Sequence, residues 1–259
     1  GGLRATANMI SYEIPLALSV LTIIVMFGTL DLGVIVEKQT HLWFGVIPAW
    51  NVFTQPLAFI LFLIAIHAEA NRAPFDLAEA EQELVGGYHT EYSSMRFALF
   101  FLAEYAGMIT TSCVLVTLFF GGWHVPWITD GGVEGAPVSV TDSLLLAVVR
   151  GVVLYTKALL IMFVFMWVRW SLPRFRFDQL MMLAWRALIP ISLGILLVTA
   201  IVVYVFGGGA TSPGEFIPLP MALSLLGGNI AVLIITMLLS LVLPAPPATN
   251  RRLAIQSRF

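Results

Sequence analysis

Six long apolar segments constrain this chain more than any other feature of its sequence. Each is roughly 20 residues long, the length that an α-helix needs to cross the hydrocarbon layer of a membrane. Of the 259 residues, 59% are hydrophobic and only 11% are charged, about half the charged share of a soluble domain. We therefore predict an all-α polytopic membrane protein with spans near residues 9–29, 46–67, 95–119, 143–168, 184–206 and 221–243.

The loops complete a prediction of domains and orientation. Residues 1–244 form one predicted membrane domain, and residues 245–259 form a short basic tail. If the spans alternate in direction, ten of the 13 lysines and arginines fall on one side and Lys38 alone falls on the other. Positive residues mark cytoplasmic loops, so both termini and the tail are predicted to face the cytoplasm or the mitochondrial matrix.

The loop between the second and third spans carries an unusual density of acid. The segment AEANRAPFDLAEAEQELVGGYHTEY, residues 68–92, is predicted to be cytoplasmic and is also partly apolar. In a soluble protein such a run is usually a solvated helix face, but its apolar residues favour packing against the bundle. Carboxylates this close raise one another's pKa and titrate as a coupled group, which suits a proton relay. The six are Glu69, Asp76, Glu79, Glu81, Glu83 and Glu91.

Glu13, Glu104 and Lys157 are charged residues that fall inside predicted spans. A bare charge at bilayer depth is costly, so each is expected to face protein or water. Each could be locked structurally by a hydrogen bond or an ion pair. Two glutamates at membrane depth beside an acidic loop also indicate proton handling, and both readings stay open.

The segment RWSLPRFRFDQLMMLAWR, residues 169–186, is basic and aromatic. Positive-inside anchoring explains much of it, and it could also pair with the acidic loop, bind a lipid headgroup or dock a soluble partner. The four histidines have no metal-ligand spacing, so no metal site is predicted. Neither a phosphate-binding glycine loop nor a nucleophile–base arrangement is evident, and nothing points to nucleic acid.

Several of these stretches together resemble the H subunit of respiratory complex I, the proton-pumping NADH:quinone oxidoreductase, which is called ND-one in mitochondria. The similarity covers the chain in the family's order from Gly1 to about Phe206. It is carried by GGLRATANMISYEIPLALS at 1–19, EANRAPFDLAEAEQELVGGYHTEYSSM at 69–95, FALFFLAEYAGMI at 97–109, LFFGGWH at 118–124 and RWSLPRFRFDQLMMLAWRALIP at 169–190.

The resemblance implies a subunit that forms much of a quinone tunnel and a carboxylate path coupling quinone reduction to proton translocation. It implies no cofactor bound by this chain alone, with quinone as substrate and with FMN and iron–sulfur clusters in partner subunits. The implied proton path is Glu13, Glu79, Glu81, Glu83, Glu91 and Glu104. The implied quinone cavity and its junction with that path are Glu69, Arg72, Asp76, Arg169 and Arg174.

Two departures from the family's pattern accompany the resemblance. The family's first spans are missing, which indicates an N-terminally truncated chain, and residues 221–243 add a span that we expect to be peripheral, facing lipid or a partner. The resemblance implies the bacterial inner membrane, with the mitochondrial inner membrane less favoured, and partners among the other complex I subunits.

Alternative functions are the equivalent subunit of a membrane-bound hydrogenase or deazaflavin-dependent dehydrogenase, an ion-coupled transporter, and a structural anchor. A transporter is expected to show an internal repeat, which this chain lacks.

Overall fold

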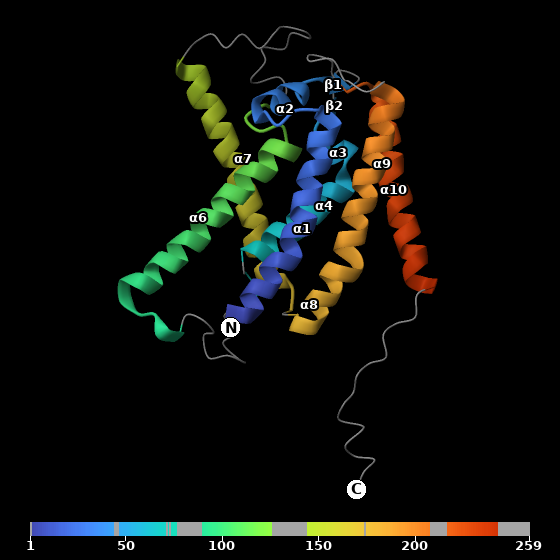
Figure 1. The fold of residues 1–259 in the computed structure, drawn as a ribbon. Helices are drawn as coiled ribbons and strands as arrows, with labels where there is room; N and C mark the ends of the chain where they lie inside the picture. The colour runs from blue at the N-terminus through green and yellow to red at the C-terminus, as the bar shows by residue number, and fades with distance from the viewer. Residues whose placement is uncertain are drawn as a thin grey trace.

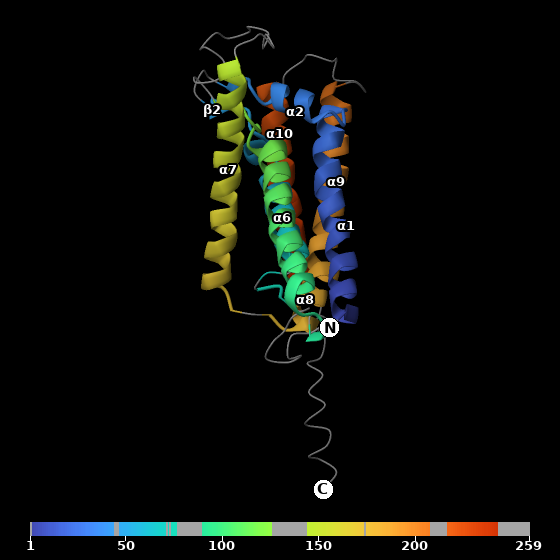
Figure 2. The ribbon, with the colours of Figure 1, turned by 90° about the vertical axis from the view of Figure 1, so that its left-hand side faces the viewer.

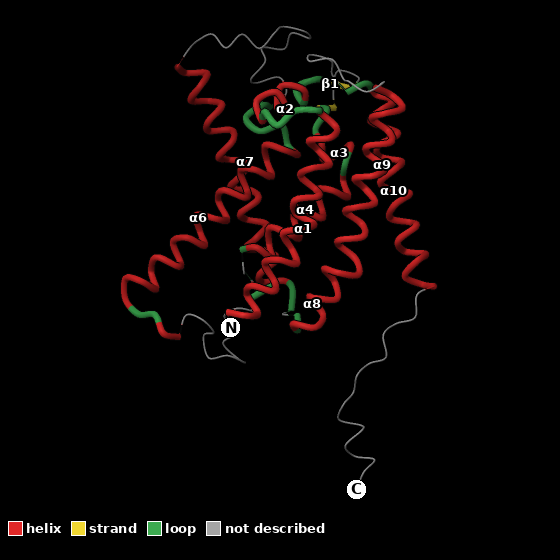
Figure 3. Tube along the Cα trace, in the orientation of Figure 1, coloured by secondary structure: helices red, strands yellow, loops and turns green. Residues whose placement is uncertain are grey.

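The computed structural model describes residues 2–43, 47–70, 72, 74–76, 90–125, 144–173, 175–207 and 217–242. These residues form a bundle of helices (Figures 1 and 3). Two short antiparallel strands, β1 (Leu42–Trp43) and β2 (Ile47–Pro48), interrupt the helical pattern. The helices are α1 (Gly2–Phe27), α2 (Leu32–Lys38), α3 (Asn51–Thr54), α4 (Pro56–Glu69), α6 (Ser94–Phe119), α7 (Leu144–Ser171), α8 (Phe177–Leu183), the π-helical turn η2 (Ala184–Leu188), α9 (Ile189–Gly207) and α10 (Leu219–Val242).

Five helical stretches in the described part of the chain are long and apolar enough to cross a membrane. This agrees with the expected polytopic membrane class, although most of the acidic loop lies outside the described residues. The five are Gly2–Phe27, Ser94–Phe119, Ala147–Ser171, Phe177–Phe206 and Leu219–Leu239.

The second predicted span, 46–67, is not one continuous helix. Gln55 separates α3 from α4 with a non-helical backbone, φ −131° and ψ 56°. The ring of the following Pro56 disfavours helical geometry at Gln55, and a proline is well accommodated in the first turn of the new helix. The α4 helix therefore has only 14 residues, a length of about 21 Å.

Successive long segments run in opposite directions between the two ends of the bundle (Figures 1 and 2). The lower end in Figure 1, called the site end below, carries the start of α1, the start of α6 and helix α8. The upper end, called the far end, carries α2 and the β1–β2 ladder. Because α10 also ends near the site end, its direction fits the predicted alternation of spans.

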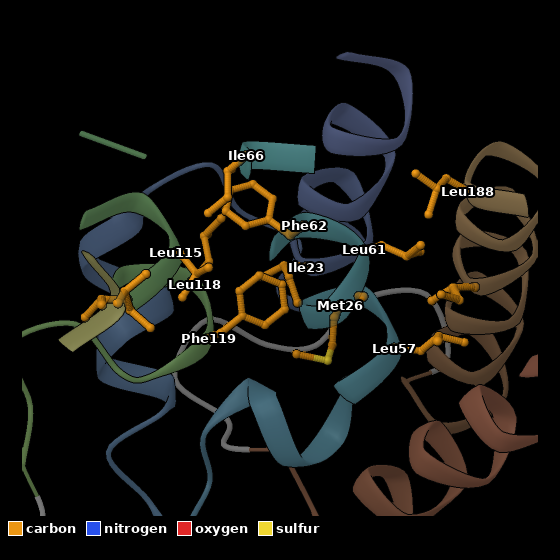
Figure 4. Close-up of a cluster of buried hydrophobic side chains, with 14 of the residues drawn as sticks. Ile23, Met26, Leu57, Leu61, Phe62, Ile66, Leu115, Leu118, Phe119 and Leu188 are labelled. Atoms are coloured by element: carbon orange, nitrogen blue, oxygen red, sulfur yellow. The ribbon is translucent and has the colours of Figure 1, made fainter. Parts of the chain in front are cut away.

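The apolar core lies between α1, α4 and α6 (Figure 4). Phe62 of α4 and Phe119 of α6 are almost completely buried, with ring centroids 5.8 Å apart. Ile23 and Met26 of α1 pack into the same cluster. These contacts join helices that are distant in sequence, so the core sets where α4 and α6 stand relative to each other.

At the far end, Gln39 satisfies the backbone where α6 stops. Its side-chain nitrogen donates to the carbonyl of Thr117 at 3.2 Å, and its side-chain oxygen accepts from the amide of Gly121 at 3.0 Å. Gly121 has φ +69°, which an L residue rarely adopts, and a Cβ there would lie 2.8 Å from Trp50. A helix end needs such partners because its last carbonyls have none within the helix.

Lys157 of α7 completes the cap on α6. Its ammonium donates to the carbonyls of Phe120 at 2.8 Å, Gly122 at 3.1 Å and His124, and it lies 4.9 Å from the ring centroid of Trp50. Cations at the C-terminal end of a helix interact favourably with its dipole. Of the two readings of Lys157, these contacts support the structural one.

Candidate functional site

An ion pair between α6 and the turn after α4 joins two of the predicted site residues. Arg72 follows α4 and Glu104 lies on α6, and the guanidinium Nε is 3.2 Å from a carboxylate oxygen. The side chains are only 12% and 18% exposed, so water screens the pair weakly. The guanidinium also lies 4.5 Å from the ring centroid of Tyr105, a cation–π contact.

A second pair of acids lies on α1 and at the end of α4. Asn8 of α1 donates to the carbonyl of Ala68 at 3.2 Å, which holds the two helices together beside Glu13 and Glu69. Glu69 ends α4 beyond the predicted span 46–67, and partial burial and the charge of Glu13 raise the pKa of its carboxyl. The two predicted site residues therefore interact electrostatically although both are exposed.

The turn after Arg72 is anchored to the basic segment. The Tyr12 hydroxyl of α1 donates to the carbonyl of Leu180 at 3.1 Å. The Tyr12 ring packs edge-on against the ring of the buried Phe75, with 5.7 Å between the ring centroids. The centroid of the Phe75 ring is in turn 6.2 Å from that of Phe175. The amide of Phe175 also donates to the carbonyl of Pro74. Among the roles left open for the basic segment, these contacts support packing against the start of the acidic loop.

A π-helical turn lies close to these contacts between α1 and the basic segment. The indole nitrogen of Trp185 in η2 donates to the Ser11 hydroxyl of α1 at 3.2 Å. Ser11 in turn lies 3.5 Å from the sulfur of Met181. Single π-helical turns within α-helices are frequent at functional sites, and this one places a polar contact between α1 and the end of the basic segment.

The structure brings together only part of the predicted set. Five predicted residues lie on the helices and the turn described above: Glu13, Glu69, Arg72, Asp76 and Glu104. Asp76 follows Phe75 directly and is half-buried. Glu91 and Arg169 are exposed near the ends of α6 and α7 and belong to no described cluster. Four predicted residues lie outside the described part of the chain: Glu79, Glu81, Glu83 and Arg174.

Sequence reasoning missed the polar residues that support the acids. Asn8 and Trp185 were not predicted to matter, although Asn8, Tyr12 and Ser19 recur on one buried face of α1. A polar stripe at helical spacing within an apolar helix is the signal that could have identified that face. Within the described ranges, no group of three His, Cys, Asp or Glu residues is placed to hold a metal ion.

The raised pKa of Glu69 predicts a pH-dependent effect of Glu69→Gln. A carboxyl whose pKa is higher in the folded protein loses its stabilising contribution as the pH rises through that pKa. The glutamine variant should therefore melt at a slightly higher temperature than wild type above neutral pH and at a similar temperature near pH 4. Thermal unfolding in detergent micelles measures this.

The matched control for Glu69 is Glu37→Gln, an exposed carboxylate on α2 at the far end. The effect at Glu69 should be small because the side chain is partly hydrated. A variant that melts below wild type at pH 8 would contradict repulsion between Glu69 and Glu13.

Comparison with known proteins identifies the family. The family model described as NADH dehydrogenase matches residues 1–200. The chain is 43% identical over 206 residues to one H subunit of the NADH-quinone oxidoreductase of Cytophaga hutchinsonii, covering 80% of this chain and 56% of that protein. The corresponding H subunit from Flavobacterium johnsoniae is 47% identical, with 78% and 55% covered. NADH-quinone oxidoreductase subunit 8 of Rhodothermus marinus is 46% identical, with 80% and 59% covered.

The chain thus spans a little more than half the length of the curated relatives it matches. The family model includes α1, the turn with Arg72, α6 with Glu104, and the segment from Phe175 to η2. The resemblance inferred from the sequence motifs is confirmed, and the chain belongs to the NADH dehydrogenase family, that of the H subunits of NADH-quinone oxidoreductases.

Proposed function

We propose that this chain acts as a membrane subunit of a proton-translocating NADH-quinone oxidoreductase. In this role it helps to form a quinone-binding tunnel and a carboxylate path that couples quinone reduction to proton translocation. The other subunits of the complex hold FMN and iron–sulfur clusters, and the complex lies in a bacterial inner membrane. The names of the three bacterial relatives support the quinone-linked assignment over a hydrogenase or a deazaflavin-dependent dehydrogenase.

The observation that carries the proposal is the weakly hydrated pair of Arg72 and Glu104. Such a pair is sensitive to any new charge nearby, because its attraction is poorly screened. Negative charge arriving at the cavity side competes with Glu104 for the guanidinium, and a carboxylate that loses its cation binds a proton more readily. Arg72 therefore converts a charge change in the quinone cavity into proton uptake on α6.

The two halves of the proposed path have different support. The geometry supports a start at Glu69, Arg72 and Asp76 and a continuation at Glu13 and Glu104, since these lie on mutually packed elements. Glu79, Glu81, Glu83 and Glu91 extend the path along the acidic loop, and Arg169 and Arg174 belong to the cavity side. These six assignments rest on the family's motifs.

The test is the triple variant Glu79→Gln, Glu81→Gln and Glu83→Gln in the assembled complex. Glutamine keeps the size and polarity of each side chain but cannot carry a proton, so coupled quinone reduction should fall by at least about tenfold while assembly survives. The rate of quinone reduction and the rate of proton pumping in sealed vesicles measure this.

The control is again Glu37→Gln, a carboxylate distant from the site end. It should leave both rates unchanged. If the triple variant assembles and then reduces quinone and pumps protons as wild type does, the relay is wrong.

A further inference from the structure

Helix α10 packs so closely against α9 that the contact leaves little room for a side chain at two glycine positions. A Cβ added at Gly228 would lie 2.4 Å from a methyl of Val198, and one added at Gly194 would lie 3.3 Å from a methyl of Val232. Glycines on both helices therefore permit the approach. The expectation of a peripheral span at 221–243 describes only the outer face of α10, which is apolar and exposed.

A buried hydrogen-bond network crosses this helix contact. The Asn229 amide nitrogen donates to the side-chain oxygen of Gln55 at 2.8 Å and lies 3.2 Å from the carbonyl of Thr54. The Gln55 amide nitrogen donates to the Thr199 hydroxyl of α9 at 2.9 Å. The three side chains are at most 4% exposed, so water cannot replace these bonds. The Asn229 nitrogen also lies 2.9 Å from the carbonyl of Leu225 in its own helix, so the bonds to Gln55 and Thr54 are the ones that reach across the helix contact.

This network includes the residue at the break between α3 and α4. Gln55 is the residue whose non-helical backbone separates these helices, and Pro56 follows it as the start of α4. The carbonyl of Thr54 at the same break receives the Asn229 amide. Because α4 has only 14 residues and moves largely as a unit, a displacement of its start also shifts its end, from which the chain continues to Arg72.

We propose that Asn229 is a positioning residue: through Gln55, α10 fixes the start of α4 and thereby keeps Arg72 against Glu104. Helix α10 lies beyond residue 200, where the match to the family model stops. This chain therefore supports the site from a segment outside the matched region. The inference stands on the fold and the ion pair and does not require the proposed quinone chemistry.

The test uses a cross-linking reporter in the full chain in native membranes. Cys113 is first replaced by Ser, and Arg72→Cys and Glu104→Cys are introduced so that a short bismaleimide links the two positions. The ion pair is absent from this reporter, so the cross-link yield depends on where helix packing places the end of α4 relative to α6. Asn229→Leu should reduce the cross-link yield severalfold and lower the melting temperature, because the Gln55 amide loses a buried partner.

The double variant Gln55→Leu with Asn229→Leu separates positioning from general stability. With both amides removed, neither amide is left buried without the other, so the melting temperature should recover in part; the Thr54 carbonyl and the Thr199 hydroxyl still lack their donors. The cross-link yield should stay low because the directional contact is absent. An unchanged yield in Asn229→Leu, or full recovery of both readouts in the double variant, overturns the proposal.

A pair of adjacent glycines gives an independent control. Gly228→Ala pushes a methyl into Val198 and should also reduce the cross-link yield, whereas Gly227→Ala, with no atom within 4 Å of its Cβ, should not. Equal yields in these two variants would show that the packing of α10 against α9 does not affect the position of residue 72.

Discussion

Replacing Lys157 by Met should lower the free energy of unfolding by about 3 kcal/mol. Methionine has a similar length but no donor, so the carbonyls of Phe120, Gly122 and His124 lose the ammonium that they share. Three charge-assisted hydrogen bonds and the contact with Trp50 disappear together. Thermal unfolding in detergent micelles, with wild type measured in the same detergent, gives the difference.

The matched control for Lys157 is Tyr155→Phe on the same helix. Tyr155 is 62% exposed, so loss of its hydroxyl should change the melting temperature little. A Lys157→Met protein as stable as the Tyr155→Phe protein would mean that the cap on α6 is satisfied in another way, for example by water that enters from the far end.

Breaking the pair of Arg72 and Glu104 should have the largest effect on function. Arg72→Met leaves the Glu104 carboxylate without its cation in a poorly hydrated position, which should cost about 3 kcal/mol of stability. Glu104→Gln leaves the guanidinium without its anion, at a comparable cost. Either variant should also abolish coupled proton pumping if Glu104 belongs to the path.

A double-mutant cycle distinguishes the pair from two independent residues. If the side chains act together, the variant with both substitutions should be destabilised by clearly less than the sum of the single variants. Arg96→Met, an exposed arginine in the first turn of α6, is the control and should have little effect. Additive losses of stability would contradict the ion pair, and normal pumping in an assembled Glu104→Gln complex would contradict its role.

The apolar runs predicted the long helices well, because a helix that crosses lipid must be apolar along its whole length. The predicted segment 95–119 corresponds to α6 at Ser94–Phe119. The same reasoning missed the break at Gln55, since the segment 46–67 is apolar enough overall to span a membrane despite Asn51, Thr54 and Gln55. A single proline did not reveal the break either, because Pro15 lies inside the continuous helix α1. At the break, the Thr54 carbonyl and the Gln55 side chain find hydrogen-bond partners in α10, which the sequence alone does not reveal.

The candidate site shows the same division. The resemblance to the family nominated Arg72 and Glu104 separately, one as a junction residue and the other as a path residue, and these roles stay predictions. Their ion pair could not be predicted, because it depends on how α4 and α6 lie against each other. The role of Asn229 was equally hidden, since one asparagine in an apolar helix does not name its partner.

The order and chemistry of the residues were thus sufficient to predict a helical membrane protein and its family, and they nominated acidic and basic candidates whose roles stay predictions. Apolar length, charge asymmetry and motif identity are all readable along one chain. The partners of the buried polar groups were decided only when the helices packed. Lys157 closes α6, Arg72 meets Glu104 and Asn229 holds Gln55, because a polar group in an apolar interior must find whichever donor or acceptor the packing brings within reach.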